Sequence, residues 1–358
     1  MCRKVVLAAN EQCSLVFHIV DRIVDRQFKL GDAEKAMYLK FMRQYEDFSG
    51  IEVKSFCIMS NHTHLLLKIP RKSDVEIDDE EFLRRLRVLY GPDRMQVVER
   101  VLQDCRNNKA SKAARELKEQ YTYRMGDVSE FMKSLKQKFS RWYNKEHART
   151  GTLWEDRYSL TLVGEGRATQ LTSAYIDLNP LRAGMVKDPA DYKWSSYGEA
   201  CAGRKLARQS LFDVMCSVEP GANAECIAPE NEADALNQYR MILAEEGRAD
   251  DAGVVSALGE RQSKRRKRSR GFSKKEVAKI LKRGGKLTLS QMLRCKARCF
   301  TAGFAIGSEE FVNSVIAVIQ QETGVFKKRK TGAKPVKHSA EAELYSLRNL
   351  QKSPVEIE

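Results

Sequence analysis

The sequence predicts an α+β protein: a ferredoxin-like sandwich with a central antiparallel sheet, a helical insertion and a mainly helical C-terminal extension. Three observations predict this fold class. Strand-like and helix-like segments alternate from residue 14 onward, and two strand-like segments in the middle follow each other directly. A charged, helical stretch then interrupts the alternation before it resumes.

The first four segments define the start of the sandwich. "SLVFHIVDRIV" (Ser14–Val24) is rich in β-branched residues and predicts a strand. "IEVKSFCIM" and "HTHLLLKI" predict two more strands, joined by a turn at Ser60 and Asn61. Between the first strand and these two, residues 31–48 predict a helix with Asp32 as its N-cap. Its expected apolar stripe consists of Ala33, Ala36, Met37, Phe41 and Tyr45.

The remaining segments complete the pattern. Residues 73–124 are charged and helical, and Gly91-Pro92 interrupts them, which indicates an insertion. "VSEFMKSLKQKFSRWYNKEH" predicts an amphipathic helix, and "GTLWEDRYSLTLV" predicts a strand or hairpin. "RATQLTSAYIDLN" predicts a helix that Pro180 should end near Asn179. The expected apolar positions of the amphipathic helix are Phe131, Leu135, Phe139 and Trp142.

Changes in composition suggest the domain boundaries. We expect a main domain at 1–200, with the insertion at about 73–125, and a helical connector at 201–260. A basic arm and a small helical module should occupy 261–326, followed by a disordered tail at 327–358. Residues 261–275 carry nine Lys or Arg in fifteen positions. This run is either a nonspecific arm that grips a nucleic-acid backbone or a disordered linker.

Charge and cysteine content narrow the classes of function. A formal net charge of +15 favours a polyanionic partner, because Lys and Arg that neutralise phosphates release counterions. The alternative is a highly charged, solvated surface. No apolar run reaches the roughly 18 residues of a membrane span, and no secretory signal is evident, so we expect a cytoplasmic protein. Nine scattered cysteines without a CxxC argue against a disulfide framework or a zinc ribbon.

Two histidines stand out in "FCIMSNHTHLLLKIP". His62 and His64 are separated by one residue, so on a strand they share one face and could grip a metal ion. By themselves, two such histidines are more often satisfied or exposed side chains. The question is therefore whether another part of the sequence supplies the rest of a site.

Four motifs together indicate that other segments supply the rest of the site: "MSNHTHLLL", "GTLWEDRY", "AYIDLNPLRAGMV" and "WSSY". Between Leu15 and Tyr197 the sequence resembles the IS200/IS605-like Y1 transposases, which are HUH single-strand nucleases, and above all their REP-associated tyrosine transposase branch. The resemblance implies that His62 and His64 hold a metal ion, with Thr63 where the family usually has a hydrophobic residue. It implies further that Tyr175 is the nucleophile and that Asn179 is the third metal ligand.

The same resemblance implies the reaction. It predicts a metal-dependent endonuclease and strand transferase that acts on single-stranded or hairpin DNA, such as repetitive extragenic palindromes, through a 5′-phosphotyrosine intermediate. The expected cofactor is Mg²⁺ or Mn²⁺, and imidazole ligands suit Mn²⁺ better. The protein would be a monomer or a homodimer, in the cytoplasm and associated with the nucleoid.

Other residues are candidates for DNA contact. Trp154 could stack on an unpaired base, a contact worth about 1–3 kcal/mol. Basic candidates for the phosphate backbone are Lys54, Lys136, Arg141, Arg157 and Arg167. Each of these could instead be a structural or solvated side chain. Tyr143 is a rival nucleophile on a basic helix, although packing is the more common role for such a residue.

Two other functions stay open at this stage. A domesticated, non-catalytic regulator that binds hairpin DNA would keep the fold without the reaction; the presence of both histidines and the tyrosine favours the enzyme. A zinc-dependent hydrolase would need a third ligand or general base at a suitable distance from His62 and His64, and the sequence offers no convincing one.

Overall fold

The computed structural model describes residues 14–71, 77–218, 228–244, 293, 296–301, 303–323, 333–336, 344–347 and 355–356. The chain divides into two compact units. The first consists of Met1–Leu162 with Ala317–Lys330, and the second of Val163–Ile316 with Thr331–Glu358. None of the helices in the described residues combines the length and the apolar character that a membrane span requires.

The first unit has the strand order of a ferredoxin-like sandwich. β1 (Leu15–Arg22), β2 (Glu52–Ile58), β3 (His62–Ile69) and β4 (Ser159–Val163) lie in the order β2-β3-β1-β4. β3 runs antiparallel to both of its neighbours, β1 and β2. The split β-α-β pattern follows, since β3 lies between β1 and β2. The predicted α+β class and antiparallel centre are therefore confirmed.

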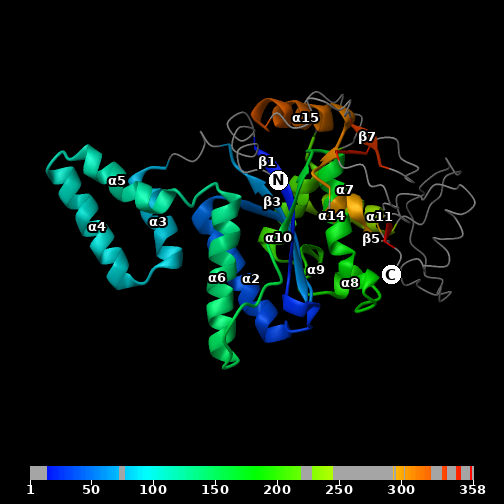
Figure 1. The fold of residues 1–358 in the computed structure, drawn as a ribbon, viewed down its shortest axis with the longest axis horizontal. Coiled ribbons are helices and arrows are strands. Elements are labelled where there is room, and N and C mark those ends of the chain that lie inside the picture. The colour runs from blue at the N-terminus through cyan, green and yellow to red at the C-terminus, as the bar shows by residue number, and fades with distance from the viewer. Residues whose placement is uncertain are drawn as a thin grey trace, which may run out of the picture. The chain divides into compact units, whose positions relative to one another are not determined.

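Two helices cover one face of this sheet. α2 (Asp32–Ser49) follows the short 3-10 helix η1 (Val24–Arg26), and α6 (Val128–Glu146) packs beside it (Figure 1). The hydroxyl of Tyr38 on α2 lies 3.3 Å from that of Thr63 on β3. Lys136 on α6 reaches Asp21 on β1, with Nζ 2.9 Å from Oδ1. Thr63 and Asp21, which are register partners, thus mark the helix-covered face.

The structure of α2 corrects two sequence expectations. Ala33 and Ala36 are exposed, whereas Phe41 and Tyr45 are buried as predicted. The buried side of α2 also includes Lys35, Tyr38, Met42 and Phe48. Asp32 is the first helical residue, and Gly31 is the N-cap. A stripe drawn through small residues fails here because the larger aromatic side chains remove more surface from water.

On α6 the prediction of buried Phe131, Leu135 and Phe139 is confirmed. Trp142, the fourth expected position, is only half-buried, and its neighbour Tyr143 is buried instead. Asp127 caps the start of this helix by accepting hydrogen bonds from two backbone N–H groups, at 2.7 and 3.0 Å.

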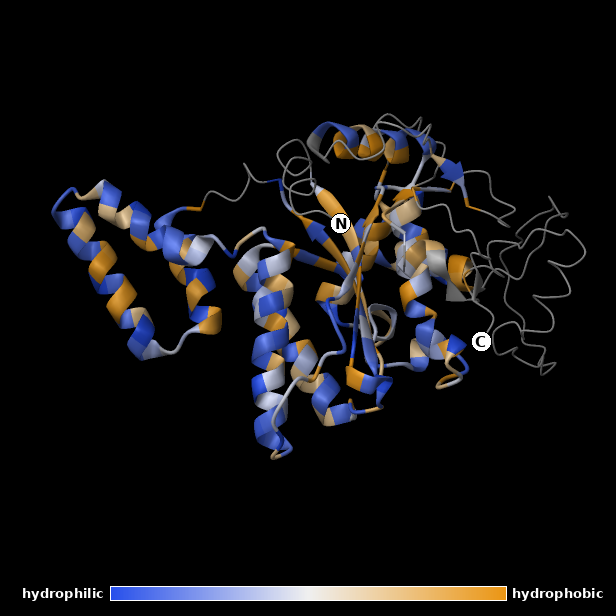
Figure 2. Cartoon of the chain, in the orientation of Figure 1, coloured by the Kyte–Doolittle hydropathy of each residue, from blue (hydrophilic) through white to orange (hydrophobic). Residues whose placement is uncertain are grey.

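The described part of the predicted insertion, from residue 77 onward, forms α3 (Asp79–Leu89), α4 (Pro92–Asn107) and α5 (Ser111–Thr122). α3 packs against α2, and α4 packs against α5 (Figure 1). Figure 2 shows that α4 carries both hydrophobic and hydrophilic residues, as expected for a helix that buries one side. Pro92 lies in the first turn of α4, where its missing N–H costs nothing.

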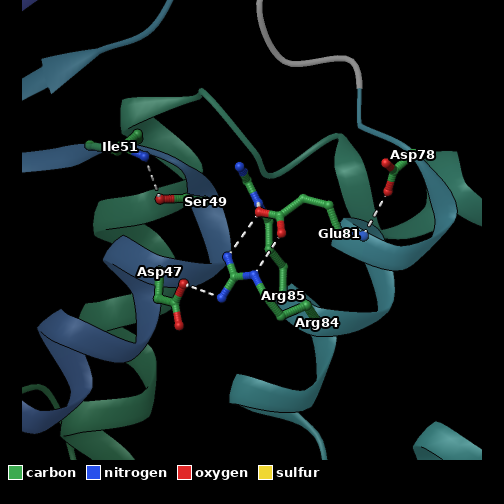
Figure 3. A network of polar contacts seen from close by, with 7 residues as sticks. All are labelled: Asp47, Ser49, Ile51, Asp78, Glu81, Arg84 and Arg85. Atoms are coloured by element: carbon green, nitrogen blue, oxygen red, sulfur yellow. Dashed lines mark hydrogen bonds and ion pairs between the residues drawn. The ribbon is translucent and has the colours of Figure 1, made fainter.

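Charged side chains fasten α3 to α2 (Figure 3). Arg84 donates to Asp47 on α2 at 2.7 Å and to Glu81 on its own helix at 2.6 Å. Arg85 also donates to Glu81, and Asp78 caps α3 through the N–H of Glu81 at 2.8 Å. These partners are partly exposed, so each contributes at most about 1 kcal/mol.

After β4 the described residues are mainly helical, as predicted. Between residues 167 and 244 it forms α7 (Arg167–Asp177), α8 (Asn179–Arg182), η3 (Pro189–Asp191), α9 (Ser196–Cys201), α10 (Lys205–Met215) and α11 (Glu232–Ala244). Toward the C-terminus it forms β5 (Lys296–Ala297), α14 (Arg298–Thr301), β6 (Ala305–Gly307), α15 (Glu309–Thr323), β7 (Lys334–Pro335), β8 (Tyr345–Ser346) and β9 (Val355–Glu356). The basic run at 261–275 lies outside the described residues.

Candidate nuclease site

His62 and His64 lie together with a third histidine on the sheet face opposite the helices. Their ring centroids are 5.0 Å apart, at an interplanar angle of 74°. Nδ1 of His64 lies 2.9 Å from Nε2 of His18 on β1, and these two rings stack at 5.2 Å. His18 and His64 are only 1% and 3% exposed. Alternation along the two strands explains the cluster: Val20 is the register partner of His64, and His18 lies diagonally across from His64 on the same face.

The first histidine of the pair is held by its neighbour in the turn. Nδ1 of His62 lies 2.6 Å from Oδ1 of Asn61. Nδ2 of Asn61 donates to the backbone carbonyl of Arg26, at 3.1 Å. Because a carbonyl only accepts, this contact orients the amide so that Oδ1 faces His62. His62 is half-buried, so it is the more accessible of the two histidines.

Thr63 points to the other face, as the alternation of a strand requires. It is 1% exposed, and the Tyr38 hydroxyl satisfies its side chain. A polar residue is tolerated at this position because it has a buried partner, which accounts for the departure from the usual hydrophobic residue.

The residues present can supply part of a metal site. Within the described residues, no group of three or more His, Cys, Asp or Glu side chains is placed to hold a metal ion. His62 and His64 offer two imidazoles, a donor type that Mn²⁺ and other divalent ions accept. A third ligand would have to be of another type, such as the amide oxygen predicted at Asn179. The donor set fits a divalent ion and does not provide the three or four protein ligands typical of a zinc site.

Tyr175 lies on α7, in the second unit. The helix begins after Gly166, whose φ of +69° is accessible mainly to glycine. The Tyr175 side chain is 1% exposed. Its ring stacks on that of Phe300 in α14, with centroids 4.7 Å apart, and the Arg182 guanidinium carbon lies 4.0 Å from the Tyr175 centroid. The candidate nucleophile is therefore covered by side chains of its own unit.

Asn179 belongs to a different helix from Tyr175. α7 ends at Asp177, two residues earlier than expected, and α8 starts at Asn179 with Pro180 in its first turn. Nδ2 of Asn179 lies 3.3 Å from the carbonyl oxygen of Tyr175 and 3.0 Å from that of Ile176. The amide thus caps the end of α7, which leaves Oδ1 as the atom that could ligate a metal ion.

Asp177, two residues after Tyr175, is a buried anchor that sequence reasoning did not single out. Its Oδ2 accepts from the hydroxyl of Tyr239 on α11 at 2.7 Å. Its Oδ1 accepts from Ser196 Oγ at 3.0 Å and from the N–H of Tyr197 at 3.1 Å. Burial raises the pKa of Asp177 to about 7, although these hydrogen bonds oppose the shift. The network ties the tyrosine helix to α9 and α11.

Part of the chain matches a model of a known protein family. Residues 11–77 and 108–179 match the family model described as "Transposase IS200 like". The match includes His62, His64, Tyr175 and Asn179. The matched part of the chain is similar to IS200-like transposases. The unmatched residues between the two segments coincide with α3 and α4, and the match ends before Trp194–Tyr197.

Among solved structures, this chain is similar to one titled "Structure of the REP associates tyrosine transposase bound to a REP hairpin". The identity is 13%, the TM-score is 0.33, and the alignment covers 54% of this chain and 81% of that one. No curated protein matches the chain.

The residues predicted to contact DNA differ in accessibility. Arg141 and Arg157 are exposed. Lys54 pairs with Glu52, and its side chain is 11% exposed. Arg167 is half-buried in the first turn of α7. Contact between these residues and DNA stays a prediction.

Lys136 and Trp154 are packed together beneath the surface. Nζ of Lys136 binds Asp21 and the carbonyl of Asp156, and it lies 5.2 Å from the Trp154 centroid. Nε1 of Trp154 donates to Ser140 at 2.9 Å, and the residue is 7% exposed. Stacking of Trp154 on a base therefore stays a prediction that requires the ring to be uncovered.

Tyr143, the rival nucleophile, is also packed. It is 5% exposed, and its hydroxyl donates to the carbonyl of Lys29 at 3.5 Å. Burial raises the pKa of Tyr143, which disfavours the nucleophilic phenolate. These contacts favour a packing role.

The strand register brings an unpredicted cation to the histidine pair. Arg22, at the end of β1, is the register partner of His62, so the two side chains share one face. Arg22 is exposed. "FHIVDR" places His18 and Arg22 on one face by alternation, but only the pairing of β1 with β3 shows that this face also carries the histidine pair.

Proposed function

We propose that this protein is a metal-dependent endonuclease and strand transferase, a transposase that nicks and rejoins single-stranded DNA near a hairpin. The observation that carries the proposal is the pair of adjacent imidazoles, His62 and His64, in an IS200-like transposase domain. The surroundings are basic, with Arg22 beside the pair and a net charge of +15 for the chain. Hairpin DNA such as a repetitive extragenic palindrome is the substrate class that we propose. Because such DNA is part of the chromosome, we propose that the protein acts in the cytoplasm, at the nucleoid.

The chemistry follows from the side chains. The Tyr175 hydroxyl attacks the phosphorus, an Oη–P bond forms, and the bond from phosphorus to the 3′ oxygen breaks. The phenol gives up one proton, the departing 3′ oxygen takes up one, and the 5′ phosphate stays on the tyrosine. Attack by another 3′ hydroxyl reverses the step and rejoins the strands.

His62, His64 and Asn179 are the residues that we propose to hold Mg²⁺ or Mn²⁺. When bound, such an ion polarises the scissile phosphate and stabilises charge on its oxygens. The histidines act as neutral ligands, and Asn179 contributes Oδ1 while its Nδ2 stays on the α7 carbonyls. Arg22, Arg141 and Arg157 supply exposed positive charge for the DNA backbone.

The test is a covalent adduct on a hairpin oligonucleotide with a single-stranded flank, in the presence of Mn²⁺. The wild-type protein should form an adduct that survives denaturing electrophoresis, and Tyr175→Phe should abolish it. Tyr123→Phe is the matched control, because Tyr123 is 60% exposed and lies on the insertion. An adduct that persists in Tyr175→Phe would assign the nucleophile to another residue.

One observation favours a second function, that of a non-catalytic regulator that binds hairpin DNA. Tyr175 is 1% exposed and lies under Phe300, so it is not accessible to a phosphate in this conformation. A regulator would bind the hairpin tightly and form no adduct at any Mn²⁺ concentration. The same electrophoresis, combined with a binding titration, separates the two functions.

A further inference from the structure

Both histidines of the candidate metal site have a hydrogen-bonding partner at Nδ1. For His62 the partner is Oδ1 of Asn61 at 2.6 Å, and for His64 it is Nε2 of His18 at 2.9 Å. A neutral imidazole carries its proton on one nitrogen and a lone pair on the other. The partner at Nδ1 therefore decides whether Nε2 can ligate a metal ion.

For His62, the side-chain amide of Asn61 decides which ring nitrogen carries the proton. Nδ2 of Asn61 faces the carbonyl of Arg26, so Oδ1 faces His62 and can only accept. His62 must then donate from Nδ1, and the lone pair of a neutral His62 resides on Nε2. Asn61 therefore sets the tautomer of His62 in the metal-free protein.

For His64 the partner can act in either direction. If Nε2 of His18 donates, a neutral His64 holds its proton on Nε2 and cannot ligate there. If Nδ1 of His64 donates to His18, the lone pair is on Nε2. A metal ion on Nε2 therefore selects the second direction, and His18 is the acceptor that permits it. Both rings are almost fully buried, which favours a defined hydrogen bond over exchange with water.

We propose that His18 and Asn61 are positioning residues that make His64 and His62 present Nε2 to a divalent metal ion. This inference rests on the proposed function, because the metal ion is the one proposed for the nuclease site. The hydrogen bonds themselves exist without it. Partners of this kind orient ligands, and their loss typically weakens metal binding about 10- to 100-fold.

The first experiment needs no metal. The chain has five histidines, so ¹⁵N labelling of their rings gives a spectrum that single substitutions can assign. In the metal-free protein, His62 should be protonated on Nδ1, and a scalar coupling across the hydrogen bond should link the ring nitrogens of His18 and His64. A His62 protonated on Nε2, or the absence of that coupling, overturns the corresponding half of the proposal.

The second experiment measures Mn²⁺ affinity by electron paramagnetic resonance. His18→Phe keeps an aromatic ring for the stack with His64 and removes the acceptor. We expect it to weaken Mn²⁺ binding about 10- to 100-fold. His18→Gln keeps an acceptor and should recover much of the affinity. His147→Gln is the control, because His147 is exposed and pairs with Glu34 at 3.0 Å.

The outcomes distinguish this inference from the proposed function. If His18→Phe binds Mn²⁺ as well as the wild type, the role of His18 is wrong. If the wild type itself does not bind Mn²⁺, the metal site of the proposed function fails, and the NMR result still decides whether the two hydrogen bonds exist.

A second inference has an independent basis, the cover over Tyr175. Phe300 is completely buried and stacks on Tyr175 at 4.7 Å, with the rings inclined by 20°. Arg182 lies over the same ring and donates to the backbone carbonyls of Tyr175 and Leu293, at 2.7 and 2.5 Å. Leu293 and Phe300 both come from the C-terminal extension, beyond the part of the chain that matches the family model.

We infer that Phe300 is an autoinhibitory cover, which must leave the Tyr175 ring before the hydroxyl can reach a phosphate. This inference rests on the proposed function of Tyr175. Accessibility is measured by nitration of tyrosines with tetranitromethane and peptide mass spectrometry. Tyr123, 60% exposed, is the reactive reference, and fully buried Tyr38 is the protected one.

In the wild type, Tyr175 should be as protected as Tyr38, and Phe300→Leu should raise its nitration and the rate of adduct formation several-fold. Phe300→Tyr, which keeps the ring, should change neither. Addition of the hairpin oligonucleotide to the wild type should also raise nitration, a readout that requires no variant to fold. If Tyr175 stays protected both in Phe300→Leu and in the wild type with the hairpin oligonucleotide, Phe300 is not an autoinhibitory cover. If nitration of Tyr175 rises but no covalent protein–DNA adduct forms, Tyr175 is not the nucleophile.

Discussion

The guanidinium of Arg182 lies over the Tyr175 ring, 4.0 Å from its centroid, and also donates to the Tyr175 carbonyl at 2.7 Å. Arg182 follows Tyr175 by seven residues, across the break between α7 and α8. One side chain thus holds the ring and the backbone of the candidate nucleophile together.

Arg182→Gln should therefore destabilise the protein. The variant loses a cation–π contact and charge-assisted hydrogen bonds to two carbonyls, for a total of about 2–3 kcal/mol. Lys205→Gln removes the same charge from an exposed position and should change the free energy of unfolding by less than about 0.5 kcal/mol. Urea unfolding measures both. Equal stability of the two variants would contradict a structural role for Arg182.

Asp177 should make stability depend on pH. Its pKa is raised by burial from 3.8 to about 7, so the folded state binds a proton more tightly than the unfolded state. The stability that protonation of Asp177 contributes is fully present below pH 3.8 and is lost as the pH rises to about 7. Asp177→Asn should remove this dependence, and relative to the wild type the variant should gain up to about 4 kcal/mol between about pH 4 and pH 8.

Urea unfolding of both proteins at several pH values checks this expectation. The amide oxygen introduced by Asp177→Asn can still accept from Ser196 and Tyr197, so the network should survive the substitution. Parallel curves for the variant and the wild type would mean that Asp177 is ionised throughout.

The pair of Lys136 and Asp21 should also respond to pH. Burial raises the pKa of Asp21 to about 6, and the attraction of Lys136 opposes the shift. Lys136→Met leaves the buried carboxylate without its cation and should cost about 3–5 kcal/mol at about pH 8. The cost should shrink toward acidic pH, where protonation neutralises the carboxylate. The double variant Asp21→Asn, Lys136→Met should recover most of the stability.

The same variants test whether Lys136 contacts DNA. If its role is to neutralise Asp21, the double variant should bind the hairpin oligonucleotide as tightly as the wild type. Binding that falls in the double variant as much as in Lys136→Met would assign the lysine to the DNA instead.

Arg22 should contact a backbone phosphate next to the histidine pair. Arg22→Gln should weaken hairpin binding several-fold and reduce the slope of log K against log salt by about 1. Lys112→Gln is the control, because its side chain is 91% exposed and lies on the insertion. Fluorescence anisotropy at several salt concentrations gives both quantities. A salt slope unchanged in Arg22→Gln would remove this residue from the interface.

The sequence alone determined the order of elements and the identity of the candidate chemistry. Alternation over "HTHLLLKI" placed His62 and His64 on one face, and adjacency of two strands predicted the antiparallel centre. Local periodicity suffices for these conclusions because a strand fixes the direction of each side chain. For α2 it sufficed only in part: Phe41 and Tyr45 are buried as predicted, whereas Ala33 and Ala36 are exposed.

Only the tertiary structure decided what surrounds the site. The register of β1 against β3 brought His18 and Arg22 to the histidine pair, and the break at Asp177 turned Asn179 into a cap of the tyrosine helix. The stack of Phe300 on Tyr175 joins residues that are far apart in the chain. Such contacts depend on how separate segments pack, and no periodicity within a single segment records them.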